Sequence, residues 1–204
     1  NELRLWNVPQ RYALAVEATP PPRAALLPHI WLSDEEIRQG QRLLEQLPDK
    51  AGTPPIALHP YATHPDKAWK EAYWRQLMEL FESRGIPWIV IGRGNGMEGI
   101  PASRNFTNRT SLRETCALLK SSSLLITGDS GPMHLAGAVG TPVLALFGPT
   151  TEEWGFFPAG PKDRVLESQL DCRPCTLHGK KHCDRNHACM QSITPEQVMR
   201  ALDE

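Results

Sequence analysis

The chain has 204 residues, of which 40% are hydrophobic, so it is long enough for one domain with a buried core. Its formal net charge of −1 gives no basic field, which argues against nucleic acid or an anionic membrane surface as a partner. No apolar run has membrane-spanning length, and the first residues lack the pattern of a signal peptide, so the expected compartment is the cytoplasm.

Residues 1–32 are expected to be irregular. Proline stands at position 9, at positions 20–22 and at position 28, and each proline interrupts regular backbone hydrogen bonding. This stretch is interpreted as a linker, or as the remnant of a preceding domain, and the ordered domain is expected to span residues 33–204.

Strands and helices are expected to alternate after residue 33. The sequence Ser33-Asp34-Glu35-Glu36 is a capping box, which predicts a helix that begins there and runs to about Leu47. Short apolar runs predict strands at 56–59, 88–92, 124–127 and 143–148, with 105–107 and 164–167 as further candidates. Helical patterns cover 70–84, 111–120 and 131–139. Apolar strands that alternate with helices indicate an α/β fold, a Rossmann-like parallel sheet with helices on both faces.

The stretch TGDSGPMHLAGAVG at 127–140 joins a predicted strand to a predicted helix. Its Gly-Asp-Ser-Gly-Pro core looks like a serine-protease loop, but that role requires an all-β scaffold, and the G-x-S-x-G of an α/β nucleophile elbow is absent. The backbone N–H groups of Ser130 and Gly131 at a helix N-terminus favour a phosphate instead. The alternative is a structural turn, in which Asp129 caps the helix and His134 is a surface side chain.

A second candidate loop follows the first strand of the sheet. There Thr63 can donate a hydrogen bond to a phosphate oxygen, and Lys67 supplies a cation for a diphosphate. Trp69 is interpreted as a wedge beneath the loop. Because both loops follow strands of one parallel sheet, they open on the same edge, where ligands bind. The alternative for Lys67 is a solvated surface lysine.

Together, the two loops resemble those of the C-terminal domain of family 9 glycosyltransferases, the bacterial heptosyltransferases. The K-x-W element is Lys67-Ala68-Trp69, and the D-[ST]-G-x-x-H-x-A element runs from Asp129 to Ala136. The continuations Gly140-Thr141-Pro142 and 147–150 (FGPT) also match. The likeness covers about residues 33–204, including a cysteine-rich segment at 168–192.

The resemblance implies the C-terminal half of a two-domain GT-B glycosyltransferase. Such a domain binds the nucleotide sugar, typically ADP-heptose, whereas an N-terminal domain binds the lipopolysaccharide core acceptor and carries the aspartate proposed as general base. The reaction implied is inverting transfer of heptose, without a cofactor. No catalytic residue is therefore expected within this chain, which is expected to be inactive alone. The implied location is cytoplasmic, with peripheral contact to the inner membrane through the missing domain as the alternative.

Site residues carried over from the family are donor-binding. Lys67 and Thr63 would hold the diphosphate together with the amides of Ser130 and Gly131, and Asp129 and His134 would face the sugar or its phosphate. Glu98, after the second strand, is the candidate for binding the ribose. Thr110 lies where the family packs adenine and is a polar departure from that pattern.

Four cysteines lie within 18 residues near the end of the chain: Cys172, Cys175, Cys183 and Cys189. Three histidines lie between them, at positions 178, 182 and 187. Four thiolates can close a structural zinc site, but only one C-x-x-C is present. Reduced or disulfide-paired thiols and an iron–sulfur cluster remain alternatives.

Two other functions remain open at this stage. One is a different GT-B nucleotide-sugar enzyme, such as an epimerase, and the other is a non-catalytic nucleotide-binding or cysteine-centred module.

Overall fold

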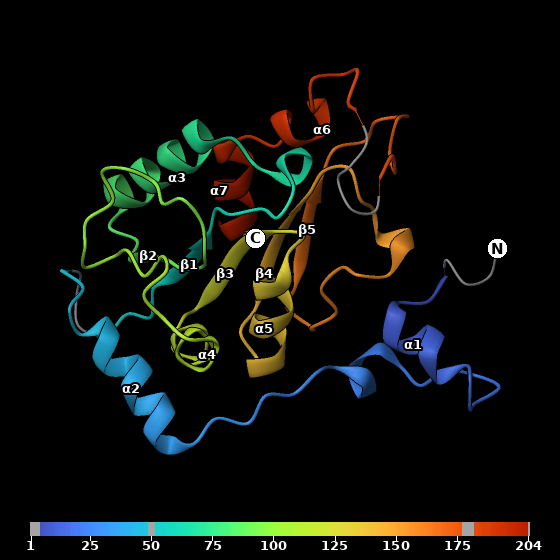
Figure 1. Ribbon diagram of the computed structural model, residues 1–204, viewed down its shortest axis with the longest axis horizontal. Helices are drawn as coiled ribbons and strands as arrows, with labels where there is room; N and C mark the ends of the chain where they lie inside the picture. The colour runs from blue at the N-terminus through green and yellow to red at the C-terminus, as the bar shows by residue number, and fades with distance from the viewer. Residues whose placement is uncertain (1–4, 49–51, 177–181, 204) are drawn as a thin grey trace.

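A five-stranded parallel sheet forms the centre of the molecule (Figure 1). The computed structural model describes residues 5–48, 52–176 and 182–203. The strand order is β2-β1-β3-β4-β5. The strands are β1 (Ile56–His59), β2 (Trp88–Val90), β3 (Leu124–Gly128), β4 (Val143–Phe147) and β5 (Arg164–Glu167). The α/β fold expected from the sequence is confirmed, and so is the candidate strand at 164–167. The candidate at 105–107 contributes only a single bridge, between Val90 and Asn105.

Helices cover both faces of this sheet (Figure 1). Helices α3 (Glu71–Arg84), α6 (Ala188–Gln191) and α7 (Pro195–Asp203) lie on one face. On the other face lie α4 (Leu112–Lys120) and α5 (Gly131–Val139), with α2 (Asp34–Leu44) packed against α4. The side chains of β1 point alternately to the two faces of the sheet. Ile56 and Leu58 pack in the core beneath α3, α6 and α7, and Ala57 packs in the core beneath α4 and α5.

Local sequence signals set the helix ends. The predicted capping box at Ser33 is present, with the Ser33 hydroxyl accepting from the Glu36 amide, but α2 ends at Leu44 and not near Leu47. Gly85 ends α3 in the left-handed conformation, at φ 63°. The buried side chains of α3 are Trp74, Leu77, Met78 and Phe81, whereas Tyr73 and Leu80 are half-buried.

The expectation that residues 1–32 are irregular is wrong for two segments, α1 (Val8–Ala13) and a 3-10 turn η2 (Arg23–Leu26). Asn7 and Gln10 form a capping box that starts α1, and Pro9 lies within its first turn, where a missing N–H costs nothing. The segment is attached to the domain, since the Val8 amide donates to Gly155 O (3.0 Å) and Arg11 Nη2 donates to Glu153 O (2.6 Å).

The pairing of β1 with β3 places a histidine in the core. His59 lies opposite Thr127 in the register, and His59 Nδ1 is 3.0 Å from Thr127 Oγ1. Only 6% of His59 is exposed. This burial lowers the pKa of the imidazole from 6.5 to about 4, so the ring is neutral at pH 7.

Gly40 packs α2 directly against the backbone of α4. A Cβ at Gly40 would lie 2.7 Å from the carbonyl carbon and oxygen of Ala117. We expect Gly40→Ala to lower the free energy of unfolding by about 1–3 kcal/mol in urea titrations, because the two helices must separate. Gly137→Ala in α5 is the matched control, since a Cβ there meets nothing within 4 Å, and it should leave stability unchanged or raise it. Equal losses in the two variants would contradict the close contact.

The buried His59 makes stability depend on pH. Below pH 6.5 the unfolded chain binds a proton at this residue, whereas the native imidazole stays neutral down to about pH 4. The free energy of unfolding therefore falls as the pH drops from 6.5 toward 4, and about 2 kcal/mol of it is lost between pH 7 and pH 5. Urea unfolding of the unmodified protein and of His59→Gln at these two pH values checks this. The variant should lose less stability on acidification, and an equal loss would contradict the assignment.

Candidate functional site

The strand order creates one topological switch point, between β1 and β3. From β1 the chain moves outward to β2 and then crosses back to β3 on the other side of β1. In open parallel sheets ligands bind where this reversal occurs, at the carboxyl ends of the strands. The loop after β1 carries Thr63 and Lys67, and the turn after β3 carries Asp129, Ser130 and Gly131. The two sequence-predicted loops therefore meet at the switch point.

An ion pair joins these two loops. The 3-10 turn η3 (Pro65–Lys67) brings Lys67 Nζ to 2.6 Å from Asp129 Oδ2. The two side chains are only 15% and 14% exposed. The same carboxylate oxygen accepts a hydrogen bond from Thr150 Oγ1 at 3.0 Å, so the loop that follows β4 joins the contact. Lys67 is thus held in place by a partly buried carboxylate, and it is not a freely solvated surface lysine.

A pocket of about 420 Å³ opens beside this pair. Three of the predicted donor-binding residues, Thr63, Ser130 and Gly131, line it. Thr110, which the sequence placed where the family packs adenine, is also part of the lining. Among the described residues of the lining none is a carboxylate, and Arg93 is the one that always carries a full charge. Together with the positive end of α5, this composition suits an anion.

The wall of the pocket toward β2 is a glycine-rich loop held from two sides. The ring of Tyr61 packs where Gly92 and Gly94 lack a side chain, since a Cβ at either would lie within 2.9 Å of ring carbons. Tyr61 Oη is 2.6 Å from Thr107 Oγ1. Asn108, at φ 59°, pairs its side-chain amide with both backbone groups of Gly94, at 3.2 and 2.8 Å. These contacts fix the backbone on both sides of Arg93.

Four of the seven predicted donor-binding residues do not line this pocket: the paired Lys67 and Asp129, and also His134 and Glu98. His134 lines a second pocket, of about 380 Å³, which also includes Asn7 and residues 155–160. His134 is an exposed residue, yet partial desolvation of its imidazole lowers the pKa, while the charge of Asp129 acts in the opposite direction. Glu98 is exposed and does not appear in the lining of the first pocket, and its main-chain oxygen accepts a hydrogen bond from Arg75 at 2.8 Å.

The expectation that Trp69 is a wedge is confirmed. Trp69 is 4% exposed, and its Nε1 donates to Ile193 O at 2.8 Å. Its ring meets that of Trp74 edge-on, with centroids 4.8 Å apart. The loop that carries Lys67 is thereby fixed to the segment between α6 and α7.

The structure does not assemble the zinc site that the sequence offered as a possibility, with ligands Cys172, Cys175, Cys183 and Cys189. Within the described ranges, which leave out 177–181, no group of three or more His, Cys, Asp or Glu side chains is placed to hold a metal ion. Two of the thiols have protein partners instead. Cys175 Sγ lies 3.9 Å from Pro149 O, and Cys183 Sγ accepts a hydrogen bond from the His187 amide at 3.2 Å.

The remaining observations concern the state of the thiols. Cys189 is only 6% exposed, and this burial raises the pKa of its thiol. No disulfide joins any of the five cysteines, all of which lie within the described ranges. His178, between the cysteines, lies outside the described residues.

An arginine attaches the cysteine-rich segment to the domain. Arg173 donates to the carbonyl oxygens of Gly148, Ser168 and Thr150 and to the carboxylate of Glu167. Its side chain is only 4% exposed. A buried guanidinium thus anchors this segment to the domain.

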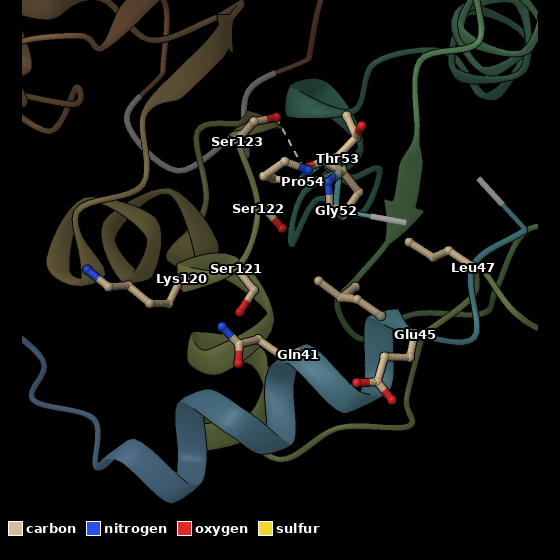
Figure 2. Close-up of a pocket in the computed structure, with 12 residues that line it drawn as sticks. Gln41, Glu45, Leu47, Gly52, Thr53, Pro54, Lys120, Ser121, Ser122 and Ser123 are labelled. Atoms are coloured by element: carbon tan, nitrogen blue, oxygen red, sulfur yellow. Dashed lines mark hydrogen bonds between the residues drawn. The ribbon is translucent and has the colours of Figure 1, made fainter. Parts of the chain in front are cut away.

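A third pocket, of about 640 Å³, lies at the opposite edge of the sheet (Figure 2). Its walls come from α2, from residues 52–55 before β1 and from Ser121–Ser123 before β3. Ser123 Oγ donates to the carbonyl oxygen of Pro55 at 3.2 Å across it. The amino ends of parallel strands are not where such sheets bind ligands, so this pocket is not the candidate site.

Sequence analysis did not identify four residues of the site as functional. His59 and Tyr61 line the first pocket, Thr150 holds Asp129, and Arg173 holds the loop after β4. The signal for His59 was present, because a histidine ends a strand that is otherwise apolar. Nothing in the local sequence indicates the partners of Arg173, which come from several separate positions.

No helix in the described part of the chain combines the length and apolar character needed to cross a bilayer.

Several curated proteins are similar to this chain in sequence, and several solved structures have the same fold. A Pseudomonas aeruginosa lipopolysaccharide heptosyltransferase 1 is 35% identical over 153 residues, covering 68% of this chain and 40% of the relative. A Haemophilus influenzae lipooligosaccharide heptosyltransferase 2 is 28% identical across 96% of this chain and 61% of its own length. The chain thus spans about half the length of these curated relatives. The structure of Escherichia coli ADP-heptose lps heptosyltransferase II superimposes with a TM-score of 0.67 at 23% identity, over 90% of this chain and 54% of that one, and so has the same fold.

The family-level match extends over most of the molecule, including α1. The family model described as Glycosyltransferase family 9 (heptosyltransferase) matches residues 7–184. The match thus begins well before residue 33, where the likeness was expected to start. This chain belongs to glycosyltransferase family 9, the heptosyltransferase family.

Proposed function

We propose that these residues form the donor-binding domain of an enzyme that transfers heptose from ADP-heptose to a lipopolysaccharide core acceptor. The observation that supports this most is the convergence of Thr63, Ser130 and Gly131 on one pocket at the switch point, beside the Lys67–Asp129 pair. The solved Escherichia coli heptosyltransferase WaaC with ADP has the same fold, with a TM-score of 0.59, and this supports a nucleotide as the ligand of the pocket.

The chemistry of the site fits a leaving group. In the proposed inverting transfer, an acceptor hydroxyl attacks the anomeric carbon of the sugar while the bond from that carbon to the diphosphate breaks. The electron pair stays on the diphosphate, and the acceptor proton passes to a general base supplied by an N-terminal domain outside these 204 residues. Groups placed to stabilise the charge that develops on the diphosphate lower the barrier.

Each predicted residue has a role in this scheme. The Gly131 amide and the Thr63 hydroxyl bind diphosphate oxygens, and Lys67 supplies the cation. Asp129 orients Lys67 and accepts hydrogen bonds from hydroxyls of the sugar. His134 and Glu98, which lie outside the pocket, would meet the sugar and the ribose at its margins. No cofactor takes part. The enzyme would work in the cytoplasm, in contact with the inner membrane through its acceptor domain.

Calorimetry against a panel of nucleotide sugars tests the proposal. Tighter binding of ADP-heptose than of UDP-N-acetylhexosamines supports the heptosyltransferase assignment. The opposite preference would favour another GT-B enzyme, such as an epimerase. Absence of binding by folded protein would favour a non-catalytic module. The acceptor is tested separately, by transfer assays on lipopolysaccharide core with the full-length enzyme.

The loss of the Lys67 cation should weaken donor binding. We expect Lys67→Ala to reduce the affinity for ADP by about 1–3 kcal/mol, the scale of a hydrogen bond to a charged group. The measurement is calorimetric titration at constant ionic strength. An unchanged dissociation constant would remove Lys67 from the site.

Two further variants control for indirect effects. Lys70→Ala removes an exposed lysine three residues later, whose Nζ contacts Gln191 Oε1 at 2.9 Å, and it should leave ADP binding unchanged. The double variant Lys67→Ala/Asp129→Asn avoids leaving a partly buried carboxylate without its cation, which alone would destabilise the protein. If only the single variant lost affinity, misfolding around Asp129 and not the missing cation would explain the effect.

A further inference from the structure

The hydroxyl of Ser130 does not cap the helix that Ser130 begins. Serine at this position normally accepts a hydrogen bond from the third amide of the helix, as Ser33 and Ser111 do at the starts of α2 and α4. Ser130 makes no such bond. Its Oγ lies 2.9 Å from Thr127 Oγ1 and 3.2 Å from His59 Nδ1. The first turn of α5 therefore lacks a side-chain cap on the side that faces the pocket.

His59 presents its other ring nitrogen to the same pocket. The residue is more than nine-tenths buried and lines the pocket. Its Nδ1 contacts two hydroxyls, whereas its Nε2 contacts no hydrogen-bonding group in the described part of the chain. The Nε2 edge faces Gly92, another residue of the pocket wall, where a Cβ would lie only 2.8 Å from Nε2. A polar atom of a largely buried side chain is costly without a partner unless a ligand or water satisfies it.

The hydroxyl network offers an arrangement that puts the ring proton on Nε2. Burial keeps the pKa of His59 near 4, so a single ring proton is present at pH 7. Thr127 Oγ1 lies 3.0 Å from His59 Nδ1 and Ser130 Oγ lies 2.9 Å from Thr127 Oγ1, and the two hydroxyls also lie 3.1 and 3.3 Å from Gly128 O. When Ser130 donates to Thr127 and Thr127 donates to His59, Nδ1 is an acceptor. The ring proton then resides on Nε2, which becomes a neutral donor directed into a pocket without a carboxylate among its described lining residues.

We propose that His59 is a ligand-binding residue whose Nε2–H donates a hydrogen bond to a phosphate oxygen of a nucleoside diphosphate bound beside the start of α5. By drawing the Ser130 hydroxyl away from the helix, the same imidazole also leaves the first turn of α5 without a side-chain cap. The inference rests on the proposed function and adds a residue to it. A neutral donor at this position strengthens anion binding without adding charge, next to the Lys67–Asp129 pair.

Two amide substitutions separate ligand contact from internal packing. Asparagine places its amide near the position of Nδ1 and keeps the contact with Thr127, but it has no group at Nε2. Glutamine reaches the position of Nε2 and gives up the Nδ1 contact. We expect His59→Asn to weaken ADP binding by about 10-fold, the loss of one hydrogen bond to a charged group, and His59→Gln to remain within about threefold of the unmodified protein. If His59 only formed hydrogen bonds with the hydroxyls of Thr127 and Ser130, His59→Asn would keep more ADP affinity than His59→Gln. That result would overturn the proposal.

Titrations with adenosine are the control for the role of the phosphate and for the integrity of the variants. His59→Asn should bind adenosine as the unmodified protein does, because adenosine has no phosphate, and an equal loss for ADP and adenosine would overturn the assignment to phosphate. If the unmodified protein bound ADP while neither variant lost affinity, only this inference would fail. If the unmodified protein bound no nucleoside diphosphate, the proposed function would fail and the inference with it.

A measurement on the unmodified protein tests the proposal even if the variants do not fold. In protein labelled with ¹⁵N at histidine, the His59 Nε2 resonance should have the shift of a protonated nitrogen and should move on addition of ADP but not of adenosine. An unprotonated Nε2, or a resonance that ADP leaves in place, would overturn the proposal.

Discussion

The parallel pairing of β1 with β3 is the constraint on which the site depends. It places the reversal of chain direction between two strands that end at the same edge, so that their following loops face each other. It also sets His59 opposite Thr127, and this contact links the two strands immediately below the pocket. Because the two faces of the sheet pack into different cores, a one-residue slip would move the side chains of a strand from one core into the other and disrupt the packing of both.

Charge in the site is arranged in advance of any ligand. Asp129 holds Lys67 through a short ion pair and is itself held by Thr150, so the ammonium loses little freedom when a ligand binds. The carboxylate also offsets the charge of the lysine, which leaves the helix start and neutral donors to provide selectivity for an anion. A diphosphate therefore meets fixed dipoles and one restrained cation, which favours charge that develops on a leaving group.

The sequence predicts the architecture well because its signals are local. Capping boxes at Ser33 and Ser111, the αL glycine at position 85 and continuous apolar strands all act within a few residues. It does not predict α1, where the prolines concealed the Asn7–Gln10 capping box. The loops of the site were predicted as well, since motifs mark them, but only Thr63, Ser130 and Gly131 of the predicted residues line the pocket. Contacts such as Asp129 with Thr150, or Arg173 with its acceptors, join distant residues, and no periodicity encodes them.

Arg173 has a consequence for the durability of the cysteine-rich tail. One planar guanidinium ties the tail to the loop after β4 and to Glu167. Its hydrogen bonds need neither an oxidised thiol nor a bound ion. Reducing agents and chelators would therefore leave this anchorage intact, and through Thr150 the same anchorage supports the carboxylate that positions Lys67. Lysine in its place, with a single nitrogen, could not span the same set of acceptors.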